Sequence, residues 1–340
     1  MKYPKIISVL LALLLLCSCE DVLEFDPGDI SPYPVMVAKP DTGDSLISVY
    51  ISNSRFFLDD YNDPQTIAGA TVVMHVNGTP LTGVYDNTSD RYLFAVHPQP
   101  GDTLHLTAQV PGFDQPMSAG TRVPQLPQVE ITDFVIDTTD FYVNDWDSSW
   151  YRGNYYYRIK FKLHSSSPLE YYSVRVLSSW GGIYGDTTHT VWDTNEANFF
   201  YVAFKVNDPI VNTTNIEDLL EGETSSGFYG NTMFFSNEMF QNGEHEFTIE
   251  YEQWGGNYGG NTLDYSQIPI LLKVQSLSRE LYLYSVTKDA QDNVDLFFSE
   301  PVQVYSNIQG GVGIFGASSL NKQRLPAPRF EHFNHSRRYQ

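Results

Sequence analysis

The feature that most constrains the fold is a two-residue alternation of apolar and polar side chains that recurs along the chain. In residues 103–110, Leu104, Leu106, Ala108 and Val110 alternate with polar residues, and residues 155–163 repeat the pattern with Tyr, Ile, Phe and Leu. Successive side chains of a strand point to opposite faces, so this alternation indicates antiparallel strands with one buried face. The 23 Tyr and 21 Phe residues also favour strands. We therefore predict a mainly β protein.

Turn signals divide the strands and the chain. Asn77-Gly78 stands between two apolar runs, which is typical of a tight β-hairpin because both turn positions favour positive φ. The Pro-rich segment 123–127 predicts a hinge between two domains, a β-sandwich at residues 34–124 and a larger β-sandwich-type domain at residues 128–320. The strands that we predict are 35–38, 45–51, 69–76, 91–96 and 103–110 in the first domain, and 129–136, 155–163, 172–177, 198–206, 246–253 and 270–275 in the second.

Two segments near the C-terminus depart from the strand pattern. Between residues 276 and 291, Leu277, Leu281, Tyr284 and Lys288 recur at helical spacing, which predicts one amphipathic helix capped by Ser276 or Ser278. Residues 321–340 are rich in Arg and Lys and contain two prolines, so we expect a basic flexible tail.

The N-terminus has the composition of a secretory signal. Lys2 and Lys5 precede the apolar run 6–16, which is shorter than the roughly 20 residues of a transmembrane helix. The following Leu16-Cys17-Ser18-Cys19 resembles a bacterial lipobox, which implies that residues 1–18 are a lipoprotein signal peptide and that Cys19 is acylated. A secretory signal cut without lipidation is the alternative, but it would leave Cys19 as a free thiol in an oxidising compartment. We expect a lipid anchor in the outer membrane.

Net charge limits the classes of binding partner, and cysteine content limits the disulfides that the protein can form. The net charge is −21, which excludes a nucleic-acid partner and docking on anionic lipid. Cys17 and Cys19 are the only cysteines, so the mature protein has no disulfide. Residues 19–33 form an acidic tether. Acidic residues directly after the acylated cysteine resemble the signal that sends Bacteroidota lipoproteins to the cell exterior, although an ordinary solvated linker has the same composition.

Two further motifs carry a family resemblance. Residues 67–72, together with Pro100-Gly101-Asp102-Thr103 and Val110-Pro111-Gly112-Phe113, resemble an Ig-like, carboxypeptidase-regulatory-like β-sandwich. The more specific motif is residues 300–316, EPVQVYSNIQGGVGIFG. With the lipobox, it is similar to the Bacteroidota outer-membrane lipoproteins of domain of unknown function 4249. Physically, Asn307 and the Gly310-Gly311 pair indicate a turn that closes the structure, which we favour over a ligand site.

The resemblance implies a function without naming catalytic residues. Family members resemble accessory lipoproteins of SusC/SusD-like, TonB-dependent nutrient importers, so the expected partners are such a transporter and a SusD-like lipoprotein, with a glycan or peptide ligand. We expect no enzyme and no cofactor, because no catalytic signature is present. The alternatives are a cell-surface hydrolase acting on glycan or peptide, and an adhesin or structural surface protein.

Aromatic loops are the best candidates for a binding site. Trp254 and Tyr258 lie among four glycines, and large rings on adaptable loops suit partner contacts or stacking on a flat ligand. The alternative is that the rings fold back over the sandwich edge, which we favour for Phe228 and Tyr229. The remaining ligand or partner candidates are Trp180, Tyr184, Trp146 and Trp150. We expect no metal; a calcium ligand set of Asp59, Asp60 and Asp63 is less favoured than a solvated acidic loop.

Overall fold

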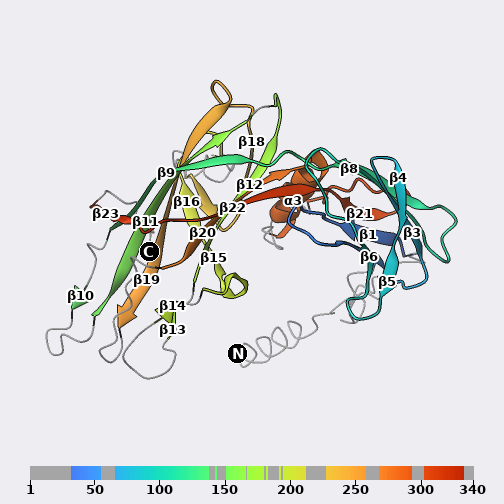
Figure 1. The fold of residues 1–340 in the computed structure, drawn as a ribbon, viewed down its shortest axis with the longest axis horizontal. Helices are drawn as coiled ribbons and strands as arrows, with labels where there is room; N and C mark the ends of the chain where they lie inside the picture. Colours follow the sequence, from blue (N-terminus) through green and yellow to red (C-terminus); the bar gives the residue numbers. More distant parts are fainter. Residues whose placement is uncertain are drawn as a thin grey trace, which may run out of the picture.

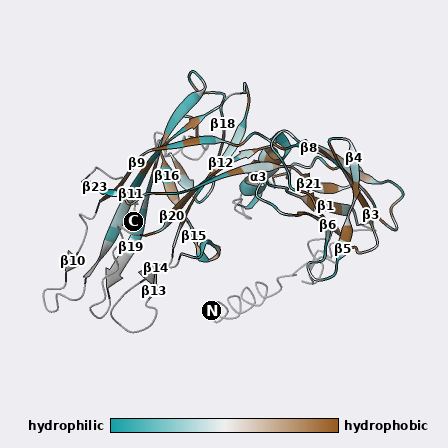
Figure 2. Ribbon diagram, in the orientation of Figure 1, coloured by the Kyte–Doolittle hydropathy of each residue, from teal (hydrophilic) through white to brown (hydrophobic). Residues whose placement is uncertain are grey.

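The computed structural model describes residues 32–54, 66–137, 142–143, 151–165, 167–179, 181–182, 191–192, 194–211, 227–257, 268–292 and 302–332. They form two β-sandwiches that lie side by side, with helix α3 (Arg279–Asp292) near the junction (Figure 1). Figure 2 shows that the hydrophobic segments lie on the strands of both sandwiches. The predicted fold class, mainly β with two sandwiches, is therefore confirmed.

The first sandwich packs a five-stranded sheet on a four-stranded one. Met36, Ile47, Leu106 and Phe315 are among the side chains that fill the core between them. The five-stranded sheet has the order β21 (Val312–Phe315), β1 (Pro34–Ala38), β2 (Ile47–Asn53), β6 (Arg91–Phe94) and β5 (Val84–Asp86), and the other has the order β4 (Thr79–Thr82), β3 (Thr71–Val76), β7 (Thr103–Gln109) and β8 (Met117–Arg122).

Local sequence signals explain this sandwich well. Leu104, Leu106 and Ala108 of β7 are fully buried, as their alternation predicted. Asn77 and Gly78 have φ values of 51° and 86° and join the antiparallel strands β3 and β4, which confirms the predicted hairpin.

The second sandwich is built around two long strands that pair along their whole length. These are β11 (Tyr151–His164) and β19 (Glu244–Asn257). Their sheet also contains β9 (Gln128–Asp137), β10 (Tyr142–Val143), β16 (Phe204–Val206), β17 (Phe228–Gly230) and β23 (Arg329–Phe330). The facing sheet contains β12 (Tyr171–Ser178), β15 (Phe200–Val202), β18 (Met233–Ser236), β20 (Ile270–Leu277) and β22 (Ser318–Arg324), and β13 (Gly181–Gly182) pairs separately with β14 (Val191–Trp192).

The C-terminal motif closes the first sandwich rather than the second. Strand β21 lies parallel to β1, and Asn307 accepts a bond from the Phe315 amide at 3.0 Å and donates one to the Phe315 carbonyl at 2.8 Å. The motif is a closing element, as predicted. The predicted domain range 128–320 differs from the structure, however, because Ile308, Phe315 and Ala317 lie in the core of the first sandwich.

The predicted tail also differs from the structure over residues 321–332, and residues 333–340 lie outside the described residues. Asn321–Arg324 belong to β22, and Arg329–Phe330 form β23 beside β9. Basic residues of this segment pair with acids of the second sandwich: Lys322 with Glu196, and Arg329 with Asp133. Their positive charge therefore holds the segment on the acidic body instead of solvating a loose tail.

The helix begins later than predicted and is capped by the second of the two predicted serines. The hydroxyl of Ser278 accepts a bond from the Leu281 amide at 3.3 Å, and its carbonyl accepts one from the Tyr282 amide. Ser276 lies in β20 instead. Leu281 is the buried helix residue, and it packs with Leu277 and Ile314 in a small apolar cluster that connects the two sandwiches.

Side chains of β22 hold the Pro-rich hinge in place. Ser319 donates to the Pro124 carbonyl at 2.6 Å, Asn321 to the Pro127 carbonyl at 2.9 Å, and Gln323 to the Val129 carbonyl at 2.9 Å. The hinge segment is therefore a braced connection between the sandwiches.

Candidate functional site

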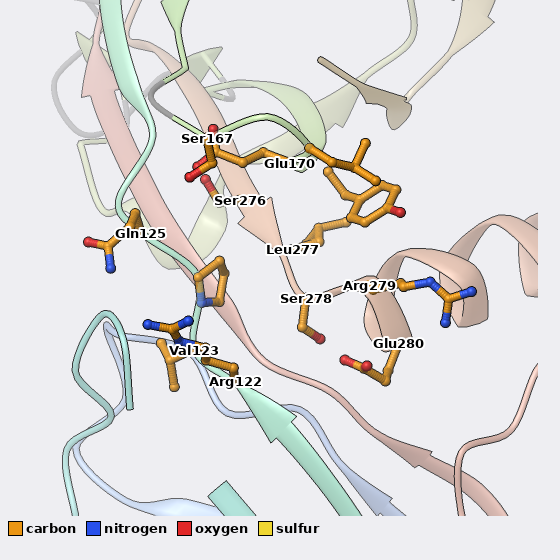
Figure 3. Close-up of a pocket in the computed structure, with 13 residues that line it drawn as sticks. Arg122, Val123, Gln125, Ser167, Glu170, Ser276, Leu277, Ser278, Arg279 and Glu280 are labelled. Atoms are coloured by element: carbon orange, nitrogen blue, oxygen red, sulfur yellow. The ribbon is translucent and has the colours of Figure 1, made fainter. Parts of the chain in front are cut away.

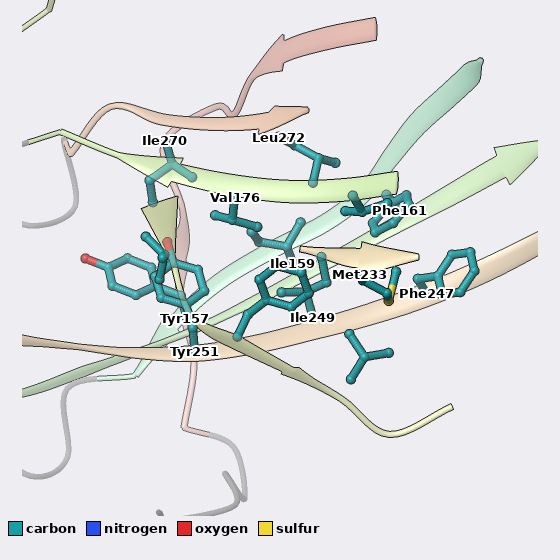
Figure 4. Packing of buried hydrophobic residues seen from close by; sticks show 14 of the residues in the cluster. Tyr157, Ile159, Phe161, Val176, Met233, Phe247, Ile249, Tyr251, Ile270 and Leu272 are labelled. Atoms are coloured by element: carbon teal, nitrogen blue, oxygen red, sulfur yellow. The ribbon is translucent and has the colours of Figure 1, made fainter. Parts of the chain in front are cut away.

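Strands β11 and β19 extend past the core at one end of the second sandwich. Each has 14 residues, which corresponds to a length of about 45 Å at the usual rise of a strand. Near this end of the core, the rings of Tyr157 and Tyr251 stack with centroids 4.8 Å apart (Figure 4), and Tyr155 is a further buried ring two residues closer to the end. Beyond them, β11 and β19 continue as a paired ribbon that begins at Tyr151 and ends at Asn257.

Trp254 lies on this ribbon with its ring half in solvent. It stands opposite Asn154 in the ladder, and its side chain is 55% exposed. Tyr251 and Gln253 point inward, and Gln253 accepts a bond from Ser178 of the facing sheet at 3.1 Å. Alternation therefore places Trp254 on the outer face of its sheet. Its exposure shows that the ring is not part of the buried core.

The other predicted ring positions cannot be placed on the fold in the same way. Trp146, Trp150, Trp180, Tyr184 and Tyr258 lie outside the described residues, as do Cys19, the acidic tether up to residue 31, and Asp59, Asp60 and Asp63. Residues 144–150 precede Tyr151 and residues 258–267 follow Asn257, so the chain enters β11 and leaves β19 at one register position. Figure 1 shows β10, β13, β14 and the end of β19 at this end of the sandwich.

Phe228 and Tyr229 differ from each other. Phe228 packs against the second core, with its ring 5.4 Å from that of Phe204, so it is folded back as predicted. Tyr229 is 49% exposed on the edge strand β17 and is not part of the core cluster, so its predicted position over the sandwich edge stays a prediction. Alternation along the strand explains the difference, because neighbouring side chains point to opposite faces.

A cleft of about 510 Å³ lies at the junction of the two sandwiches (Figure 3). Strand β8, the hinge, strand β20 and the start of α3 supply its walls. Two of its charged groups bond within the protein: Glu280 accepts from Thr121 at 3.3 Å, and Arg122 donates to the Gly101 carbonyl at 3.4 Å. Because the bond from Thr121 joins the first sandwich to the helix at the junction, the cleft has the character of a polar joint.

Glu170 forms the most tightly bonded part of this cleft. It accepts from the Ser165 hydroxyl at 2.5 Å and from the Tyr172 hydroxyl at 2.6 Å. Burial raises the pKa of Tyr172 well above its usual value, and the neighbouring Glu170 carboxylate raises it further. The Tyr172 hydroxyl therefore stays protonated and acts as a donor that orients the carboxylate.

Sequence reasoning missed this cleft, because its charged residues come from three segments that are distant in the sequence. It also missed the hinge contacts, although the polar residues at positions 319, 321 and 323 alternate along one strand and gave a usable signal. Among the described residues, no three His, Cys, Asp or Glu side chains gather as a metal would require. The part of the chain that the structure describes contains no helix long and apolar enough to cross a membrane.

These features define a class: a β protein of two connected sandwiches, with a cleft at the junction and an exposed aromatic at the free end of a long strand pair. A family model matches residues 20–324, and the chain belongs to that family, described as a domain of unknown function (DUF4249). This confirms the resemblance to domain of unknown function 4249.

Other comparisons add little. No curated protein matches the chain. It has 9% identity to a membrane-anchored protein from Corynebacterium diphtheriae, covering 74% of this chain and 55% of that one, with a TM-score of 0.19. It has 11% identity to the RrgB pilus protein from Streptococcus pneumoniae, covering 72% and 48%, with a TM-score of 0.18. The chain thus spans about half the length of each, and scores this low carry no argument.

Proposed function

We propose that the protein is a non-catalytic, lipid-anchored protein of the cell surface that serves as an accessory binding or assembly component of a SusC/SusD-like, TonB-dependent nutrient importer. Lipidation of Cys19 and the acidic tether attach it to the outer membrane, facing the exterior. The aromatic end of the second sandwich contacts the transporter, a SusD-like lipoprotein, or a glycan or peptide ligand.

The observation that carries this proposal is the position of Trp254 relative to the chain's entry into the fold. The tether leads into β1 of the first sandwich, whereas Trp254 lies near the end of β19 in the second. Figure 1 shows the two sandwiches extended side by side rather than stacked. This separation favours an arrangement in which the first sandwich is the spacer near the anchor and the second presents its ring to a partner.

The exposed ring also has suitable chemistry. A half-exposed Trp exposes apolar surface to water, and its burial against a partner recovers free energy of about 25 cal/mol per Å². Trp residues are enriched among the side chains that dominate binding energy at interfaces, and they stack on flat ligands.

The test is affinity purification of the natively lipidated protein from detergent-solubilised outer membrane, with partners identified by mass spectrometry. We expect stoichiometric recovery of a TonB-dependent transporter and a SusD-like lipoprotein, and a loss of at least about tenfold with Trp254→Ala, since a hot-spot residue contributes roughly 2 kcal/mol or more. Tyr33→Ala is the matched control, because Tyr33 is 64% exposed at the start of the first sandwich. Recovery of the protein alone contradicts the proposal and favours a screen for hydrolysis or adhesion.

A further inference from the structure

Strand β9 is a long edge strand that the chain's own C-terminal segment covers only at one end. It has ten residues, and on its inner side it pairs with β11. On its outer side β23 pairs in parallel at two positions, Arg329 with Val135 and Phe330 with Ile136. The Glu331 amide adds a bond to the Ile136 carbonyl at 3.1 Å. Among the described strands, none pairs with the outer side of residues 130–134.

The segment Arg329–His332, here called the strap, is held mainly by charge. Arg329 donates to both carboxylate oxygens of Asp133, at 3.1 and 3.3 Å, and His332 lies 3.1 Å from Asp137. Glu331 pairs with Arg158 at 3.1 Å. Arg329 is 63% exposed and His332 80%, so solvent and salt weaken the pairs that these two residues make. Such a strap is displaceable.

The strap also lies outside the part of the chain that defines the family. The family model ends at residue 324, which is the last residue of β22. Pro326 and Pro328 follow, and neither can donate a ladder hydrogen bond. The strap thus lies outside the residues that the family model matches.

We propose that the outer edge of β9 is an acceptor site for an extended, basic segment of a partner protein, and that the strap is its internal occupant. An added strand gains main-chain hydrogen bonds from the edge, and side-chain contacts set its specificity. Here Glu130 and Asp133 supply acidic contacts along one strand, and Asp137, buried beneath His332 of the strap, adds a third at its end, so the matching partner carries Arg, Lys or His at corresponding positions. This interaction surface is distinct from the Trp254 end and does not depend on the proposed function.

A peptide in trans provides the test. The protein is truncated after Arg324, and a fluorescent peptide of residues 325–340 is titrated by anisotropy. We expect saturable binding that weakens about two- to fivefold with Asp133→Asn, as loss of an exposed ion pair implies, and that weakens further as salt is raised. Asp114→Asn, an exposed acid of the first sandwich, is the matched control and leaves the affinity unchanged. A scrambled peptide shows no saturation.

A second variant covers the case in which truncation unfolds the protein. In the full chain, Arg329→Glu puts a negative charge beside Asp133 and Glu331, which repel it, so the strap competes less for the edge of β9. The wild-type peptide should therefore bind the Arg329→Glu chain about fivefold more tightly than it binds the unaltered chain. Absence of saturable binding to folded truncated protein, or to the folded Arg329→Glu chain if truncation prevents folding, overturns the proposal. Binding that ignores both Asp133→Asn and salt overturns it as well.

Discussion

The two sandwiches have cores of similar architecture that are filled by different kinds of side chain. The buried cluster of the first contains mostly aliphatic residues on strands of at most seven residues, with Tyr92, Phe94 and Phe315 as its aromatic members. The second uses stacked rings on strands of up to 14 residues; its buried aromatics are Phe134, Tyr155, Tyr157, Phe161, Tyr172, Phe204, Phe235, Phe247 and Tyr251. Ladders of rings stabilise the long strand pair over most of its length, so it can extend past the core and carry Trp254.

The sandwiches also differ in how they are closed. The first depends on β21, a strand from the far end of the sequence, whereas the second holds its long strands β11 and β19 in one continuous antiparallel ladder. Closure of the first sandwich therefore needs an ordered path through α3 and the motif at 302–317. Substitutions in the core of each sandwich and in β21 therefore measure core packing and closure by the distant strand separately.

The largest expected effect is on the aromatic core. Phe247 is fully buried, with its ring 4.7 Å from that of Phe235 and 5.3 Å from that of Phe161. Phe247→Ala should lower the unfolding free energy of the second sandwich by about 4 kcal/mol through lost burial and a cavity. Leu106→Ala, in the aliphatic core, should cost about 3 kcal/mol in the first. Calorimetry tests both; an equal shift of every transition by Phe247→Ala would show that the sandwiches unfold as one unit.

A smaller effect tests closure by the distant strand. Gly313 has φ of 123°, and a Cβ there would lie 2.1 Å from the Met36 carbonyl oxygen of the neighbouring strand. Gly313→Ala should destabilise the first sandwich by about 3 kcal/mol, since both the backbone conformation and the space exclude a side chain. Gly78→Ala is the matched control, because Gly78 also has positive φ but open space around it, and should cost about 1 kcal/mol. Denaturant titration compares them, and equal losses would contradict the role assigned to β21.

Local patterns predicted much of the fold. Alternation in β7 and β11, the Asn77-Gly78 turn and the Ser278 cap each depend on neighbouring residues, so they were readable from the sequence. Strand partnership was not, since the pairing of Val35 with Val312 joins opposite ends of the chain and leaves no local signal. The predicted strand 198–206 was partly wrong, because residues 196–198 form a short helix and two short strands follow.

The candidate site shows the same limit. The sequence identified Trp254 as a ring beside glycines but left open whether it folds back over the sandwich edge, and only the ladder with β11 shows which face of the sheet carries it. The junction cleft and the strap depend on contacts between distant segments, such as Arg329 with Asp133. Charge alone predicted a loose basic tail, because the acidic edge that holds it is not adjacent in sequence.

The smallest expected effect comes from the same substitution, Tyr to Phe, made once in each sandwich. The Tyr251 hydroxyl is buried without a hydrogen-bond partner among the described residues, whereas the Tyr92 hydroxyl donates to the Ile67 carbonyl at 2.7 Å. Tyr251→Phe should therefore raise the unfolding free energy by up to about 1 kcal/mol, and Tyr92→Phe should lower it by about the same amount. Opposite signs in urea titrations at neutral pH confirm the contrast; destabilisation by both would mean that the Tyr251 hydroxyl is satisfied.

The buried Tyr251 hydroxyl also makes the stability of the protein depend on pH in the alkaline range. Burial raises the pKa of Tyr251 well above its usual value, so the folded state retains a proton that the unfolded chain loses. Its contribution to stability is complete below about pH 10 and is lost as pH rises from there toward the folded-state pKa, by up to about 1.4 kcal/mol per pH unit. Tyr251→Phe removes this contribution, so the advantage of the variant over the unaltered chain should widen between pH 10 and 11. A constant difference over that range would show that the hydroxyl ionises as freely in the folded sandwich as in the unfolded chain.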